Sequence, residues 1–205
     1  QRQMCIRDRD RLRGDISNFT TLTKNGEGRW DISGTLNGFT IASVNQGTLG
    51  LSGDNSGYNG QLVINPQGNN DAAATVEAPA RSLPTRSGNN LNNVIDNGIL
   101  RLTQDKNESY AGQITGSGQV VKTGDGTLTL QPDAPAGNQW RGGTTINQGA
   151  IAVSKESSLG DASSAITFDG GGLRFNDNLD LAASRPLTVT AVSYTHLTLP
   201  TICSV

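Results

Sequence analysis

The side chains that come closest to hydrolytic chemistry in this sequence are five aspartates. A glycan hydrolase or lyase needs carboxyl groups that converge on one face, one to give and one to take a proton, with a basic partner nearby. No pair of these aspartates recurs at a fixed position of a repeat, so a polysaccharide lyase or hydrolase is kept as the alternative to a non-enzymatic protein. The aspartates are Asp31, Asp54, Asp71, Asp96 and Asp105.

A serine nucleophile is suggested by residues 53–57, Gly-Asp-Asn-Ser-Gly, but such a serine needs a histidine to take its proton. The single histidine, His196, lies near one end of the chain. The cysteines Cys5 and Cys203 and the methionine Met4 also lie near the ends. The origin of the ends therefore decides which chemistry is available.

The two ends resemble a translated DNA adaptor. Residues 1–8, QRQMCIRD, back-translate to a DNA word whose reverse complement reads VSYTHLTL, which is residues 192–199. One word read in both orientations is typical of adaptors that flank inserts in sequencing libraries, and such segments are set aside before the fold is considered. We expect residues 1–9 and 192–205 to be adaptor-derived, and residues 10–191 to be a natural segment truncated at both ends.

Residues 10–191 contain no cysteine, histidine or methionine. Disulfides, thiolate nucleophiles, Cys/His metal sites and histidine-based catalysis are thereby excluded from this segment. We expect no catalytic residue, metal site or cofactor in it, and we interpret residues 53–57 as a turn.

Three further features suggest ligands, and each has a stronger structural interpretation. Residues 13–15 are Arg-Gly-Asp, the tripeptide that integrins recognise, but a tripeptide arises often by chance. Residues 169–172 with residues 176–177 resemble calcium-binding glycine repeats but lack the required spacing. Trp30 and Trp140 are able to stack on glycans, although such residues more often cover the flank of a coil.

Two lysines stand next to acidic residues at expected corners of the chain. Lys24 is followed by Glu27, and Lys122 is followed by Asp125. Both pairs fit ligand contacts, but we favour solvated corner charges, because long charged side chains normally keep their heads in water.

The composition narrows the class of protein. Hydrophobic residues make up 34% of the chain and charged residues 17%, with 26 glycines and a net charge of −2. This charge gives no electrostatic reason to bind nucleic acid or an anionic membrane. No apolar run approaches the roughly 20 residues that span a bilayer. Few aromatics and many small polar residues favour short strands joined by frequent turns.

Internal repeats indicate a solenoid. Residues 45–52 (NQGTLGLS) recur as 147–154 (NQGAIAVS), and residues 96–103 are a weaker copy. Residues 24–28 (KNGEG) likewise recur as 122–126 (KTGDG). Within each copy, apolar residues alternate with polar ones, which is the period of a strand with one buried face. Asn-Gly, Asp-Gly and Gln-Gly pairs precede the strands and favour tight corners.

These features predict an all-β fold, a right-handed parallel β-helix truncated at both ends. A period near 22 residues gives roughly eight coils in a rod about 40 Å long, since stacked strands lie about 4.8 Å apart. Leu128 and Leu130 are expected to point inward. We expect residues 66–93, which contain prolines and little alternation, to leave the helix as a loop. An antiparallel sandwich is the alternative fold.

In the best repeat, residues 118–153, a lysine and paired glycines precede a Thr-Leu-Thr-Leu strand, and an aromatic residue, Gly-Gly-Thr and an Asn-x-Gly corner follow. This order of motifs resembles the autotransporter-associated β-strand repeat. Trp140 stands where the family usually has tyrosine, and residues 131–138 form a longer loop than usual. The residues that match are Lys122, Gly124, Gly126, Leu128, Leu130, Gly142, Gly143, Thr144, Asn147 and Gly149.

The resemblance implies a surface-exposed or secreted passenger stalk of a Gram-negative bacterium. Its partner would be the protein's own C-terminal β-barrel translocator, which lies outside this sequence. Roles in adhesion or autoaggregation, with a host-surface or glycan ligand, follow from family association alone.

Overall fold

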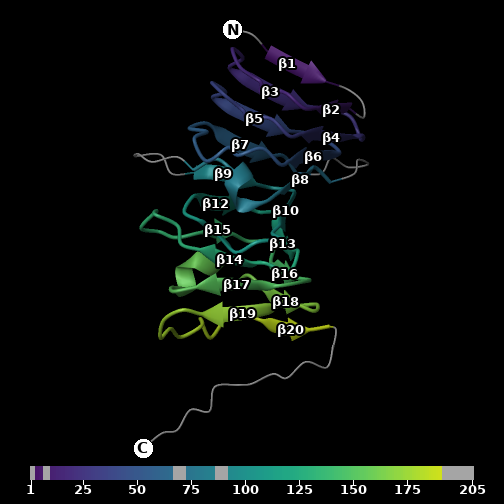
Figure 1. Cartoon of the computed structure of the whole chain (residues 1–205). Coiled ribbons are helices and arrows are strands. Elements are labelled where there is room, and N and C mark those ends of the chain that lie inside the picture. Colours follow the sequence, from purple (N-terminus) through teal and green to yellow (C-terminus); the bar gives the residue numbers. More distant parts are fainter. Residues whose placement is uncertain (1–2, 7–9, 67–72, 86–91, 191–205) are drawn as a thin grey trace, which may run out of the picture.

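Consecutive segments of the chain stack on one another in the computed structural model, which describes residues 3–6, 10–66, 73–85 and 92–190. Every strand pair in these residues is parallel, and neighbouring strands come from successive coils. The predicted parallel β-helix of about eight turns is confirmed, and the antiparallel sandwich is wrong. The stack runs from the N-terminal end at the top of Figure 1 to the C-terminal end at the bottom.

Three sheets form the sides of the rod. The first has seven strands: β1 (Gln3–Ile6), β3 (Thr21–Lys24), β5 (Ile41–Val44), β7 (Gln61–Ile64), β9 (Asn92–Asp96), β12 (Gln113–Gly116) and β15 (Gln139–Trp140). The second has nine: β2 (Asp10–Leu12), β4 (Arg29–Ile32), β6 (Thr48–Leu51), β8 (Thr75–Ala78), β10 (Ile99–Thr103), β13 (Gln119–Thr123), β16 (Thr144–Ile146), β18 (Ile166–Phe168) and β20 (Leu187–Val189). The third has four: β11 (Glu108–Tyr110), β14 (Thr127–Leu130), β17 (Ala150–Val153) and β19 (Gly172–Phe175).

The core consists of columns of like side chains, one per coil. Leu22, Ala42, Leu62, Val94 and Ile114 occupy one register position in five successive strands of the first sheet, and all are at most 1% exposed. The columns form one continuous apolar cluster that extends from coil to coil along the rod. A single coil therefore has no core of its own, which is the general condition of solenoid proteins.

The expectation of one long loop over residues 66–93 is wrong for its middle part. Strand β8 pairs with β6 on one side and with β10 on the other, and the 3₁₀-helix η1 (Ala80–Ser82) follows it. Val76 is fully buried between Leu49 and Leu100. The local sequence shows little alternation, so the strand depends on pairing partners supplied by the neighbouring coils.

Of the two ends expected to be adaptor-derived, the structure describes only part of the N-terminal one. Strand β1 lies within residues 1–9 and pairs in register with β3, from Gln3 opposite Thr21 to Ile6 opposite Lys24. Residues 192–205 lie outside the described part of the chain. Within that part, no helix has the length and apolar character needed to cross a membrane.

Candidate functional site: buried lysine corners and a charged lateral face

Lys24 ends strand β3 with its side chain inside the rod, where it is 0% exposed. Its ammonium donates to the main-chain oxygens of Asn25 at 3.1 Å and Gly26 at 2.6 Å in its own corner. It also donates to the main-chain oxygen of Gln46, one coil further on, at 3.1 Å. The interpretation of this lysine as a solvated corner charge is therefore wrong.

Lys122 repeats this arrangement at the end of β13 and is also 0% exposed. Its ammonium donates to the main-chain oxygens of Thr123 at 2.8 Å, Gly124 at 2.6 Å and Gln148 at 3.3 Å. Burial lowers the pKa of Lys122 to about 8, and the charges of Asp105 and Asp125 oppose the fall. The side chain is thus predominantly charged at neutral pH, and carbonyl oxygens replace the water that its ammonium has lost.

The two repeated motifs of the sequence are the halves of one two-coil unit. The amide of Gly26 donates to Oε1 of Gln46 at 3.2 Å, and the amide of Asn45 donates to the oxygen of Lys24 at 2.9 Å. The second copy makes the same two bonds. The amide of Gly124 donates to Oε1 of Gln148 at 3.4 Å, and the amide of Asn147 donates to the oxygen of Lys122 at 2.9 Å. We call this unit the corner clamp. The first clamp is Lys24, Gly26, Asn45, Gln46 and Gly47, and the second is Lys122, Gly124, Asn147, Gln148 and Gly149.

The two clamps occupy different corners of the rod. The first joins the first sheet to the second, because Lys24 ends β3 and β4 follows. The second joins the second sheet to the third, because Lys122 is the penultimate residue of β13 and β14 follows. The same clamp is therefore able to form at more than one corner of the solenoid.

The glycines of the clamps are required by close approach of neighbouring coils. Gly47 and Gly149 have positive φ angles of 66° and 62°. A Cβ atom added to Gly47 would lie 2.5 Å from the main-chain oxygen of Gly28, and one added to Gly149 would lie 2.4 Å from that of Gly126. A larger residue is thus excluded both by conformation and by space.

The other motif residues also serve the stacking of coils. Leu128 and Leu130 are buried, as predicted. A Cβ atom at Gly142 would lie 2.4 Å from the oxygen of Gly118, and Gly143 has a φ of 92°. Thr144 is buried and accepts a hydrogen bond of 3.0 Å from the indole of Trp140. These motif residues are therefore buried or lie close to a neighbouring coil.

Asparagines add a ladder at the corner of the first clamp. The side-chain amide of Asn45 donates to Oδ1 of Asn25 at 2.7 Å, and that of Asn65 donates to Oδ1 of Asn45 at 2.6 Å. The ladder links three successive coils along the axis of the rod. The sequence marks only Asn25 of these three as part of an Asn-Gly turn pair.

Charged side chains run along the outer face of the second sheet. Arg29 makes an ion pair of 2.8 Å with Asp31 and another with Glu77, two coils away. Glu77 also pairs with Arg101 at 2.6 Å, and Asp31 with Arg11 at 3.8 Å. We call these five residues the charged ladder. The two carboxylates hold the pKa of Arg29 above its ordinary value.

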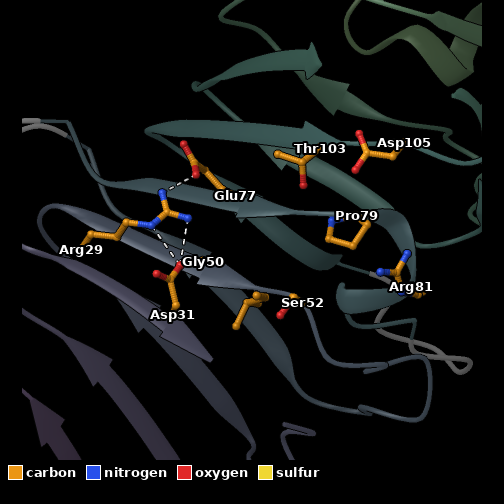
Figure 2. A pocket seen from close by; sticks show the side chains of 10 residues that line it. Arg29, Asp31, Gly50, Ser52, Glu77, Pro79, Arg81, Thr103 and Asp105 are labelled. Atoms are coloured by element: carbon orange, nitrogen blue, oxygen red, sulfur yellow. Dashed lines mark hydrogen bonds and ion pairs between the residues drawn. The ribbon is translucent and has the colours of Figure 1, made fainter. Parts of the chain in front are cut away.

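A glycine allows Arg29 to cross between its two partners. Gly50 occupies the register position between Asp31 and Glu77 and carries no side chain to fill it. Figure 2 shows the guanidinium lying over this gap. The surrounding depression has a volume of about 220 Å³ and also includes Arg81 and Asp105. It is smaller than the roughly 300 Å³ at which small-molecule pockets begin.

Comparison with known proteins gives this geometry a family. Residues 120–153, which contain the second clamp, match the passenger-associated-transport-repeat. The chain is 43% identical over 77 residues to the adhesin BmaC autotransporter of Brucella suis, covering 38% of this chain and 2% of that protein. The chain is a segment of an autotransporter passenger. Such a passenger segment lies at the cell surface, anchored to the outer membrane or secreted.

The passenger segment is similar to a second protein, and the segment is much shorter than both relatives. It is 32% identical over 165 residues to the uncharacterized lipoprotein YdeK of Escherichia coli, covering 78% of this chain and 11% of that protein. The segment thus spans about a tenth or less of the length of these two relatives. No solved structure matches it.

Of the five candidate aspartates of the passenger segment, the four that the structure describes are not gathered into one site. Asp31 and Asp105 share the shallow depression. Asp54 is exposed and accepts the amide of Ser56 at 3.0 Å in a turn within residues 53–57, as predicted. Hydrogen bonding to the side chain and then to the amide of Ser56 lowers the pKa of the Asp54 carboxyl. Asp96 is fully buried at another corner. Asp71 lies outside the described residues.

The remaining motifs of the passenger segment fall into exposed and buried groups. Residues 13–15 are exposed, and the carboxylate of Asp15 accepts the amide of Thr35 at 2.8 Å, which lowers its pKa. Trp30 and Trp140 are at most 1% exposed, so neither presents a face for glycan stacking. Asp169 accepts a hydrogen bond of 2.9 Å from the hydroxyl of Thr190. The described residues contain no group of three side chains suited to a metal ion.

Proposed function

We propose that this passenger segment is a non-enzymatic stalk that carries other parts of the passenger away from the cell surface. The observation that supports this function is the use of the repeat's own polar residues. Lys24, Lys122 and the clamp glycines bind one coil to the next, with the lysine side chains inside the rod. Residues that recur for coil-to-coil contact stabilise a rod of repeats and not a single reactive site.

Adhesion or autoaggregation is the activity we assign to the whole passenger. Support comes from the relative named as an adhesin and from a rod that offers long, regular faces. The segment would act together with a C-terminal translocator of the same protein and, at the surface, with a host or glycan ligand.

Surface display tests the stalk function. An epitope is placed before the segment, a translocator domain after it, and antibody binding to whole Gram-negative cells is measured with and without the segment. We expect higher epitope access when the segment is present, and lower access when Lys24→Met and Lys122→Met are combined. Equal access in all three strains would reject the stalk function.

A secreted polysaccharide lyase or hydrolase remains the second candidate, because one depression gathers carboxylates with arginines. Glu77 and Asp105 lie there beside Arg29 and Arg81. The purified segment is incubated with polymeric glycans, and new chain ends are measured. Cleavage that disappears in Glu77→Gln or Asp105→Asn would replace the stalk by an enzyme. The stalk predicts no cleavage by any of the three proteins.

A further inference from the structure

Asp96 places a carboxyl group inside the rod. It ends strand β9 with its side chain facing the core, and it is 0% exposed. In the first sheet it shares a register column with Lys24, Val44 and Ile64. An acidic residue thus follows two apolar residues and a clamp lysine along this column.

The surroundings of Asp96 satisfy only part of the carboxyl group. Oδ1 accepts the amide of Gly98 at 3.0 Å, whereas Oδ2 has no hydrogen-bond partner. Ile64 on β7 lies beside it in register, and a Cβ atom at Gly118 would lie only 2.4 Å from Oδ1. Close packing against a glycine leaves little room for compensating side chains.

No cation offsets the charge of Asp96 among the described residues that pack against it. Strand β7 contributes Ile64, the turn before β10 contributes the amide of Gly98, and β10 contributes the amide of Leu100. On the other side, the main chain of Asp96 approaches Gly116, the last residue of β12. Arg101 lies on the outer face of β10, where it pairs with Glu77. Titration of Asp96 therefore has no titratable partner in these contacts.

We propose that Asp96 makes the coil formed by β9 and β10 a pH-sensitive joint, which packs tightly when the carboxyl group is protonated and loosens when it ionises. An ionised carboxylate with one bare oxygen is costly in a dry interior, whereas the neutral acid loses far less on burial. This inference goes beyond the stalk function and does not depend on adhesion.

The direction of the pH dependence follows from burial. Burial raises the pKa of Asp96 to about 7, and the amides of Gly98 and Leu100 oppose the rise. In the unfolded chain the group titrates near 3.8. The folded state therefore binds the proton more tightly. Its stabilisation is complete below about pH 4, falls as the pH rises, and is lost above about pH 7.

Carboxyl NMR and hydrogen exchange on the full 205-residue chain test the joint. The ¹³C resonance of the Asp96 carboxyl is followed from pH 4 to pH 9, and amide exchange in β9, β10 and β12 is measured at pH 5.5 and pH 8. We expect a midpoint near 7. After correction for intrinsic rates, we expect the open population of these strands to rise at least about tenfold at the higher pH.

Two variants separate Asp96 from a general effect of pH. Asp96→Asn should remove the pH dependence of exchange in β9 and β10. Asp161→Asn, which changes an exposed aspartate in another corner, should preserve it. A midpoint near 4 for Asp96, or unchanged pH dependence in Asp96→Asn, would overturn the joint. The wild-type titration decides the question alone if Asp96→Asn fails to fold.

Discussion

A lysine that leaves water must find oxygen atoms for its ammonium group, and in this protein the main chain of two coils provides them. Lys122 reaches the carbonyls of Gly124 and Gln148, and Lys24 reaches those of Gly26 and Gln46. Hydrogen bonds from a charged donor contribute more to stability than neutral ones. The clamp lysines therefore stabilise the contact between coils more than a solvated lysine at a corner would.

Replacement of a clamp lysine by methionine should lower the free energy of unfolding by about 1–3 kcal/mol, because buried carbonyls lose their donor. Urea unfolding of Lys122→Met, compared with the wild type, measures the loss. Lys155→Met is the matched control, since Lys155 is exposed. Equal stability of the two variants would show that Lys122 contributes no more than a surface lysine.

Alanine at a clamp glycine should be more damaging than alanine at an open glycine. Gly149 combines positive φ with a main-chain oxygen 2.4 Å from the added Cβ atom. Gly57 has open space and no such constraint. We expect Gly149→Ala to cost about 2 kcal/mol or more and Gly57→Ala less than about 0.5 kcal/mol in thermal or urea unfolding. Similar costs at both sites would contradict the clamp geometry.

The burial of the two lysines lay beyond what local sequence predicts. The pattern located Lys24 and Lys122 at corners, and both of the motifs that make up a clamp were recognised as repeats. The oxygen atoms that receive each ammonium belong to another coil as well as its own, so the site exists only after coils have stacked. Asp96 is similar, because its burial depends on Ile64 and Gly118 from neighbouring coils.

At the scale of strands, the alternation of apolar and polar residues predicted strands with one buried face, such as β14. It did not predict β8, which depends on pairing with neighbouring strands. Residues 126–130 alternate, and β14 is where the pattern expects it. Strand β8 lies in a run rich in alanine and proline, and it is held by β6 and β10. The third sheet has four strands among the described residues, and all four lie in the second half of the chain. No local sequence pattern predicts that this sheet is confined to that half.

The charged ladder offers a test of how much its ion pairs stabilise the second sheet. A Cβ atom at Gly50 would meet Asp31 Oδ1 at 2.2 Å and Arg29 Nη2 at 2.9 Å. Both are the ends of flexible, partly exposed side chains, which are able to move aside. We expect Gly50→Ala to change the free energy of unfolding by less than about 1 kcal/mol, because exposed ion pairs contribute little.

The salt dependence of stability shows whether Gly50→Ala has displaced the ion pairs of the charged ladder. In Gly50→Ala the stability should depend less on added NaCl than in the wild type, because displaced ion pairs leave less to screen. A loss well above 1 kcal/mol would mean that the ladder holds β4, β6 and β8 together. An unchanged salt dependence would mean that Arg29 keeps both partners.

On the scale of the rod, the large apolar side chains that are exposed among the described residues gather near β19 and β20. Phe175, Leu187 and Val189 are 49%, 52% and 60% exposed, and they belong to β19 and β20, the last described strands of their sheets. An open strand edge with apolar side chains is a site for pairing with another chain. A head-to-tail contact of this kind does not close on itself, so it favours extended assemblies.

The isolated 205-residue chain should therefore self-associate as its concentration rises. Sedimentation velocity measures the mass distribution, and the double variant Leu187→Lys with Val189→Lys should shift it toward monomer. A wild-type chain that stays monomeric at high concentration would contradict the open end of the β-helix. A double variant that assembles like the wild type would place the contact elsewhere.

The position of the two clamps also bears on how such genes change in length. The first clamp turns the chain from the first sheet to the second, and the second clamp turns it from the second sheet to the third. Recombination between their similar coding sequences would join β3 directly to β14 through an intact corner. A module exchanged in this way would be a corner with its two flanking strands, which is less than one coil. Gain or loss of these modules alters the number of coils and also which sides of the rod carry a sheet.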